Sequence, residues 1–145
     1  MSDEWREPYP LHAAVQGNTR EQVAELLAAG YELNDFDDEG HTPLHHAARA
    51  GNLPMMRLLI EAGANVNAHD AASIGETPLG AIAANCTFEV AQLLVEAGAD
   101  PTIPGWMGVS ALHRARERKR GEGPQIAELL ERAARNPGSV RRRRK

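Results

Sequence analysis

The fold is decided by Thr42-Pro-Leu-His-His-Ala-Ala-Arg-Ala-Gly51, a stretch that holds the start and stop signals of one short helix. The hydroxyl of Thr42 can accept a hydrogen bond from an unpaired helix N–H, and Pro43 suits the first helical position because its missing N–H costs nothing there. Gly51 can adopt the left-handed conformation that ends a helix. Apolar residues then recur at helical spacing until Gly63. The stretch therefore predicts two short helices that run antiparallel.

The same signals return four times along the chain. The copies open on Tyr9-Pro-Leu-His12, Thr42-Pro-Leu-His45, Thr77-Pro-Leu-Gly80 and Ser110-Ala-Leu-His113. Their leucines are separated by 33, 35 and 33 residues. A unit of that length cannot bury its own apolar face, so neighbouring units must stack. We expect helix pairs near residues 10–29, 43–63, 78–97 and 111–134.

Each pair is joined to the next by a connector that is too polar for another helix. The segment between Gly63 and Thr77 is rich in turn-forming residues, and we expect it to project as an extended finger. In the third unit Cys86 takes the turn position that Gly51 has in the second. We therefore expect an altered turn at Cys86.

The repeated segment resembles the ankyrin repeat, with Thr-Pro-Leu-His-x-Ala-Ala, an Asn or Gly turn, and Leu-Leu-x-x-Gly-Ala-Asx-x-Asn. The resemblance covers residues 8–135 and implies an all-α repeat fold, an ankyrin solenoid of four helix-turn-helix repeats with projecting finger loops. The repeats run over about 9–40, 41–75, 76–108 and 109–135. Three departures weaken local capping without changing this interpretation: Tyr9 in place of threonine, Gly80 in place of histidine, and Ser110-Ala111 in place of Thr-Pro.

We expect one repeat domain over residues 9–135, between an N-terminal extension (1–8) and a disordered basic tail (136–145). A first-helix position that is alanine or valine in the other units is Arg116 in the last, so no fifth repeat should follow. The basic side chains of this unit should form a solvated terminal face. They are Arg114, Arg116, Arg118, Lys119 and Arg120.

The composition excludes several classes of protein. The single Cys86 excludes an intramolecular disulfide framework, and no apolar run approaches the roughly 18–20 residues of a membrane span. The first residues lack the pattern of a secretory signal. We expect a soluble, cytoplasmic monomer. Residues 141–145 supply five of the 16 Lys and Arg residues, so the rest of the chain carries a net charge of −9, which argues against nucleic-acid binding by the folded part.

Six histidines raise the question of a metal site, and His41, His45 and His46 are closest in sequence. No cysteine or carboxylate pattern completes a tetrahedral ligand set with them, so we expect no metal site. Asp37 and Asp38 are placed on a fingertip, where water should keep both ionised and unsuited to acid catalysis.

The resemblance instead implies that the histidines at the motif position form hydrogen bonds with neighbouring backbone groups. These are His12, His45 and His113. No serine or cysteine has the context of a catalytic nucleophile, and no glycine segment matches a phosphate loop. We therefore expect no enzyme activity and no cofactor.

The resemblance implies that the chain binds another protein through its fingertips and the exposed edge of each first helix. The predicted partner-binding residues are Phe36, Asp38, Glu39, His41, Arg49, His69, Asp70, Ser73, Ile74, Glu76, Asn85, Trp106, Met107 and Val109. Trp106 stands out, because tryptophan is enriched among interface hot spots and this one lies outside the expected core. The alternative is that Trp106 folds back onto the last repeat.

Two other functions stay open at this point. The tail residues Arg141, Arg142, Arg143, Arg144 and Lys145 could associate with nucleic acid or an anionic membrane, or could simply be solvated. The repeat could also be a structural part of a larger assembly.

Overall fold

The computed structural model describes residues 8–70 and 75–135, and these residues form eight α-helices and no strand. The helices are α1 (Pro10–Gln16), α2 (Arg20–Ala28), α3 (Pro43–Ala50), α4 (Leu53–Glu61), α5 (Pro78–Ile82), α6 (Phe88–Glu96), α7 (Ala111–Glu117) and α8 (Gly123–Arg135). A short 3-10 helix, η2 (Trp106–Gly108), lies in the third connector. The predicted all-α class and the predicted helix pairs are confirmed.

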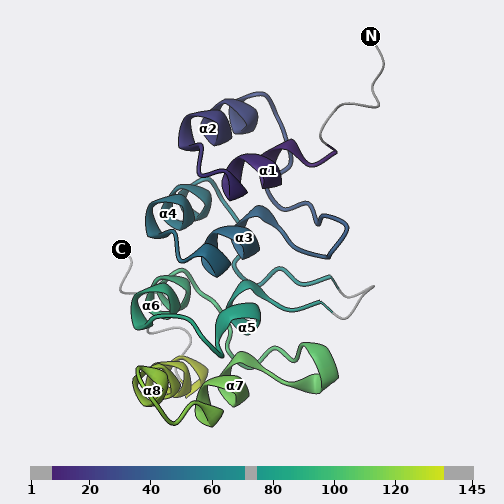
Figure 1. Cartoon of the computed structure of the whole chain (residues 1–145). Helices are drawn as coiled ribbons and strands as arrows, with labels where there is room; N and C mark the ends of the chain where they lie inside the picture. The colour runs from purple at the N-terminus through teal and green to yellow at the C-terminus, as the bar shows by residue number, and fades with distance from the viewer. Residues whose placement is uncertain (1–7, 71–74, 136–145) are drawn as a thin grey trace.

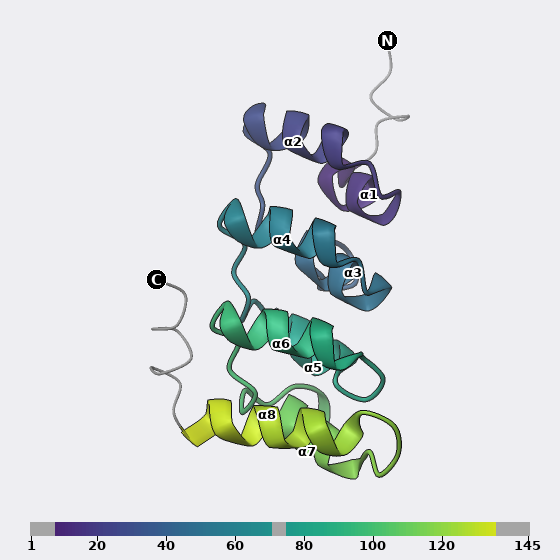
Figure 2. The same cartoon turned by 90° about the vertical axis from the view of Figure 1, so that its left-hand side faces the viewer.

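The helix pairs stack in chain order, and each pair is antiparallel (Figure 1). The first helices pack on one another in the order α1, α3, α5 and α7, while α4 packs on α6 and α6 on α8. The second helices α2, α4, α6 and α8 form a parallel row (Figure 2). The connectors project from the side of the first helices, away from that row (Figure 1).

The core follows the sequence repeat. Leu11, Leu44, Leu79 and Leu112, one from each motif, are all buried. Leucines and isoleucines of the second helices meet them from the other row and are fully buried: Leu59, Leu94, Ile126 and Leu130. Each such side chain stabilises the fold by roughly 1.5–3 kcal/mol relative to exposure, so stacking of the units supplies the stability that a single unit lacks.

The predicted start signals act as expected in two first helices. The Gly80 N–H donates to Thr77 Oγ1 (3.0 Å), and the His113 N–H donates to Ser110 Oγ (3.2 Å). The predicted stop signals also hold, because Gly51 has a φ of 67° and Asn18, its counterpart in the first unit, has a φ of 58°. Asparagine is one of the few side chains that tolerate this backbone region.

The third unit has the altered turn that Cys86 predicts. Helix α5 ends at Ile82, and the N–H groups of Asn85 and Cys86 both donate to the Ile82 carbonyl. Cys86 keeps a negative φ. The chain avoids a left-handed cysteine by ending the helix early.

The predicted solvated face of the last unit is partly wrong. Arg118 turns back onto the third unit, where its Nη1 donates to the carbonyls of Ala83 (3.2 Å) and Cys86 (2.9 Å). Arg114 is half-buried and pairs with Glu76 (3.1 Å). Arg118 thus pairs with carbonyl groups that the early end of α5 leaves without a helical partner, and Arg114 pairs with a carboxylate of the second finger.

Several sequence-based predictions lie outside the described residues: those for the extension 1–7, for Ser73 and Ile74, and for the tail 136–145. Within the described residues, no helix combines the length and apolar character that crossing a bilayer requires.

Candidate functional site

The first finger closes in a tight turn from Asp37 to Gly40. The Gly40 N–H donates to the Asp37 carbonyl (3.0 Å), and Gly40 has a φ of 77°. The Asp37 N–H in turn donates to the His41 carbonyl (2.9 Å). Aspartate at the first position and glycine at the fourth are favoured in such a turn. The turn therefore fixes Asp37 beside His41 at the base of the fingertip.

Asp37 does not lie on a solvated tip, contrary to the sequence-based prediction. Its Oδ1 accepts the N–H groups of Glu39 and His41, both at 3.0 Å, and its Oδ2 accepts from His46 Nε2 at 2.8 Å. Burial alone would raise the pKa of Asp37, but the hydrogen bonds from His46 and from the two backbone N–H groups outweigh it and lower the pKa. The carboxylate is ionised at neutral pH and held in place.

Two of the motif histidines join neighbouring units, as the resemblance implies. His12 Nε2–H donates to the carbonyls of Asp35 (2.9 Å) and His41 (3.0 Å), and His45 Nε2–H donates to the Glu76 carbonyl (2.6 Å). His45 Nδ1 accepts from the Thr42 N–H (3.0 Å), so this ring has no nitrogen left for another ligand. Burial lowers the pKa of His45 to about 4. His113 contacts no further helix pair among the described residues and is exposed beside Glu117.

His41, His45 and His46 form a histidine cluster at the base of the first finger. His41 is half-buried there, and its ring packs against the rings of the other two. Its Nε2 accepts from Arg49 Nη2 (3.2 Å), whereas its Nδ1 is buried and has no hydrogen-bond partner among the described residues. Burial and the charge of Arg49 lower the pKa of His41. His41 is thus the one cluster histidine with an unsatisfied buried nitrogen.

The tip of the third finger presents two adjacent apolar side chains to solvent. Trp106 is 52% exposed and Met107 is 76% exposed. Trp106 therefore does not fold back fully onto the last repeat. Met107 has a φ of 57°, which is unusual for a residue other than glycine, asparagine or aspartate. The apolar tip is held in a backbone conformation that costs free energy.

Glu76 of the second finger anchors this tip. Its Oε1 accepts the Trp106 N–H (2.6 Å), and its Oε2 pairs with Arg114. Gly105 is needed for this approach, because a Cβ at that position would overlap the Glu76 carboxylate. The Glu76 side chain is only 16% exposed. Glu76 therefore positions the third finger rather than lying open on the surface.

The remaining predicted partner-binding residues divide by exposure. Exposed positions are Asp38, Glu39, Arg49, His69 and Asn85. Half-buried positions are Phe36, Asp70 and Val109. Asp38 Oδ1 also accepts from the Tyr9 hydroxyl (2.8 Å). Sequence reasoning missed the inward-facing role of Asp37, although the Asp37-Asp-Glu-Gly40 spacing is a recognisable turn signal.

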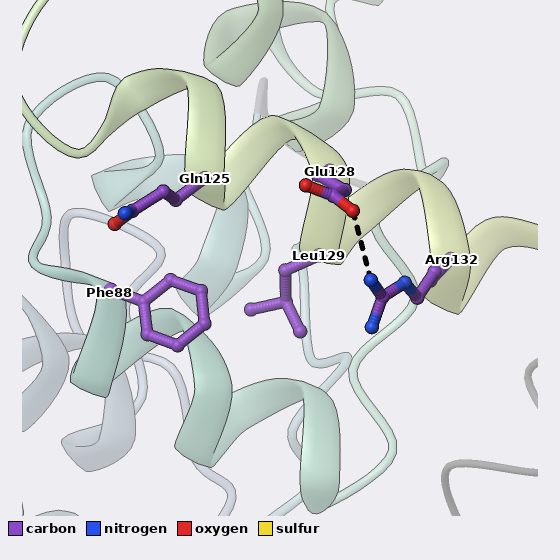
Figure 3. Close-up of a pocket in the computed structure, with 5 residues that line it drawn as sticks. All are labelled: Phe88, Gln125, Glu128, Leu129 and Arg132. Atoms are coloured by element: carbon purple, nitrogen blue, oxygen red, sulfur yellow. Dashed lines mark hydrogen bonds and ion pairs between the residues drawn. The ribbon is translucent and has the colours of Figure 1, made fainter.

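A cavity of about 300 Å³ lies between α6 and α8, in the row away from the fingers (Figure 3). It is lined by Phe88, Gln125, Glu128, Leu129 and Arg132. Glu128 and Arg132 pair with each other at 2.9 Å across one helical turn. The lining includes apolar side chains and one surface ion pair. It does not bring together a nucleophile and a base, as a catalytic site would.

Cys86 is a poor candidate nucleophile. It is buried, and burial raises the pKa of its thiol, although the nearby Arg118 partly offsets this. The reactive thiolate is therefore disfavoured at neutral pH.

Residues 2–70 match the family model for ankyrin repeats. An ankyrin repeat protein of Fowlpox virus is 36% identical over 67 residues, which are 46% of this chain and 15% of that protein. The ankyrin repeat protein nuc-2 of Neurospora crassa is 42% identical over 64 residues, 43% of this chain and 6% of that protein. An ARF GTPase-activating protein of Rattus norvegicus is 38% identical over 63 residues, 43% of this chain and 8% of that protein.

The chain therefore spans only a small part of the relatives it matches, and the likeness concerns the repeat itself. The helix pairs α5–α6 and α7–α8 continue the stacked arrangement beyond residue 70. Ankyrin repeats are generally protein-interaction modules and not enzymatic folds. The family match places residues 2–70 in the ankyrin repeat family, and the repeated motif and the all-helical stack show the same ankyrin repeat fold over the rest of the described residues.

Proposed function

We propose that this chain binds a partner protein through the surface formed by its fingertips and the exposed edges of its first helices. The observation that carries the proposal is the pair of exposed apolar side chains at Trp106 and Met107, held by a left-handed backbone at Met107. Exposed large apolar groups mark interaction sites, and local strain is retained where it serves a function.

Rigid presentation is the physical mechanism. Glu76 joins the third finger to the second, and His12 and His45 join each of the first two units to the finger that follows. A surface that is already ordered loses little conformational entropy on docking, so more of the contact energy appears as affinity.

The charge of the surface indicates the chemistry of the partner. Asp38 and Glu39 are exposed at the first fingertip, and the body of the chain is acidic. The third fingertip is apolar. A partner with a basic segment beside an apolar patch would complement both, over an interface of about 800 Å² on each side.

The proposal is tested with the double variant Trp106→Ala/Met107→Ala. Wild-type and variant chains are immobilised, and the proteins that each captures from a native lysate are quantified by mass spectrometry. We expect at least a tenfold loss of the captured partner, because a tryptophan that becomes buried on binding is a typical hot spot.

Tyr31→Ala is the matched control, because Tyr31 is an exposed aromatic residue (47%) outside the fingertips. It should leave capture unchanged, and circular dichroism should show equal helicity in all three chains. Equal capture by wild type and the double variant would contradict the proposal, as would an equal loss in Tyr31→Ala.

A further inference from the structure

The base of the first finger brings together three side chains that are typical metal ligands. Asp37, His41 and His46 each offer one ligand atom, and these atoms all lie within 4.8 Å of one another. The sequence-based prediction of no metal site considered His45 as the third member, but both nitrogens of His45 are engaged elsewhere. Asp37, which the turn directs inward, takes its place.

We propose that Asp37, His41 and His46 bind one divalent transition-metal ion of the zinc type, with one coordination position left open. Two imidazoles and a carboxylate form a ligand set that zinc accepts, with a solvent or partner atom as the fourth ligand. Tetrahedral ligands at about 2.1 Å from zinc lie about 3.4 Å apart. His46 Nε2 and Asp37 Oδ2 are 2.8 Å apart, and all three ligand atoms lie within 4.8 Å of one another, so small side-chain rotations would bring them to this spacing.

Two of the three ligands, Asp37 and His46, are supported by neighbours. Asp37 Oδ1 is held by two backbone N–H groups, which leaves Oδ2 for the ion. The Gln16 amide nitrogen donates to His46 Nδ1 (3.0 Å) in the metal-free structure. When Nε2 binds metal, Nδ1 carries the ring proton, and a flip of the Gln16 amide would turn its oxygen toward that proton. The His46 side chain is 4% exposed and that of Asp37 is 12% exposed, so the ion would be largely removed from water.

Three further observations point to a cation. The buried His41 Nδ1 has no partner in the described part of the chain, which marks His41 as the member with unused bonding capacity. The exposed carboxylates Asp38 and Glu39 lie on the same turn and favour the approach of a positive ion. A surface cavity of about 190 Å³, lined in part by Asp37 and His12, reaches the Asp37 member of the cluster.

Arg49 opposes the ion. Its Nη2 donates to His41 Nε2. An ion bound at the unused Nδ1 would leave the ring proton on Nε2, and an ion bound at Nε2 would take the lone pair that Arg49 uses, so in either case metal binding requires this exposed side chain to swing into solvent. The proposal therefore predicts a gain as well as a loss: replacing Arg49 by an uncharged residue should strengthen binding. A variant that merely damages the fold would not produce such a gain.

The test is a titration of tag-free, chelator-treated full-length chain with zinc chloride, followed by calorimetry. Wild type should bind one ion per chain. Asp37→Asn and His41→Asn should each weaken binding at least tenfold, because each removes a ligand. The turn should persist in Asp37→Asn, because asparagine is favoured at its first position as aspartate is. Arg49→Gln should bind several-fold more tightly.

The matched controls are His69→Asn and His113→Asn, since both histidines are exposed and lie outside the cluster. They should bind within twofold of wild type, and helicity should be equal by circular dichroism. If a ligand variant loses helicity, the zinc affinity of Arg49→Gln compared with that of wild type decides whether the proposal holds. Absence of saturable binding to wild type, equal binding by the ligand variants, loss in His113→Asn, or no gain in Arg49→Gln would each overturn the proposal.

Discussion

At the scale of single residues, Met107 holds a left-handed backbone that glycine would adopt without steric cost. We predict that Met107→Gly raises the free energy of unfolding by about 0.5–1 kcal/mol, since relief of strain exceeds the added entropy of the unfolded chain. Urea denaturation measures the change. Val109→Gly is the control, because Val109 has a φ of −90° and should lose stability. A less stable Met107→Gly chain would show that the left-handed backbone is not strained.

The pKa of His45 makes stability depend on pH. Burial, opposed by the hydrogen bond to the Glu76 carbonyl, lowers this pKa from 6.5 to about 4. Between these values the unfolded chain binds a proton that the folded chain does not bind. The free energy of unfolding should therefore fall as pH drops from 6.5 to 4, by roughly 2–3 kcal/mol in total, and His45 should add no further loss below pH 4.

Denaturation of the metal-free chain at pH 6.5 and 4.5 measures this dependence. His45→Gln should lower stability at both values and flatten the difference between them. His113→Gln, at an exposed position, should keep the wild-type dependence. The same pH dependence in His45→Gln as in wild type would refute the assignment to His45.

At the scale of elements, Arg118 stabilises the shortened end of α5. Its two hydrogen bonds to the Ala83 and Cys86 carbonyls are charge-assisted, and such bonds contribute about 1.5–3 kcal/mol. Arg118→Ala should lower the free energy of unfolding by an amount in that range. Arg120→Ala, in the same loop but exposed, should change it by less than about 0.5 kcal/mol. Equal effects of the two substitutions would contradict a specific role for Arg118.

The elements themselves could be predicted from local sequence, whereas some side-chain directions could not. Thr77, Pro43 and Gly51 act within one turn of their own position, so their patterns suffice to place the helix ends. Asp37 and Arg118 have partners nine or more residues away, in His46 and in the third unit. The directions of these two side chains depend on how the units stack. From the sequence alone, each is one charged residue in a charged segment, and such a segment predicts only that its side chains face water.

The candidate surface shows the same division. The exposure of Trp106 follows from its place after Pro104-Gly105, beyond the helical pattern. The position of Glu76 does not, because its partners Trp106 and Arg114 lie far away in the sequence, on the third finger and in α7. Sequence thus indicated which segments project, and the stacked structure decided which side chains hold those segments in place.

At the scale of the whole molecule, four helix pairs, each too small to be stable alone, stack into one continuous core that carries three fingers (Figure 1). The row of first helices carries the fingers, and the row of α2, α4, α6 and α8 lies behind it (Figure 2). Because each unit contacts only its neighbours, the distance between fingers is set by helix packing. This geometry favours a partner that contacts several fingers at once.

Hydrogen–deuterium exchange of the full chain, alone and with the partner that wild type captures, tests this binding mode most directly. We predict slower exchange in the finger segments 34–42 and 100–110 and at the start of α3 and α7. Peptides from α2, α4 and α6 should exchange at the same rate with and without the partner. Protection confined to that second row, with unchanged fingertips, would contradict binding through the fingers.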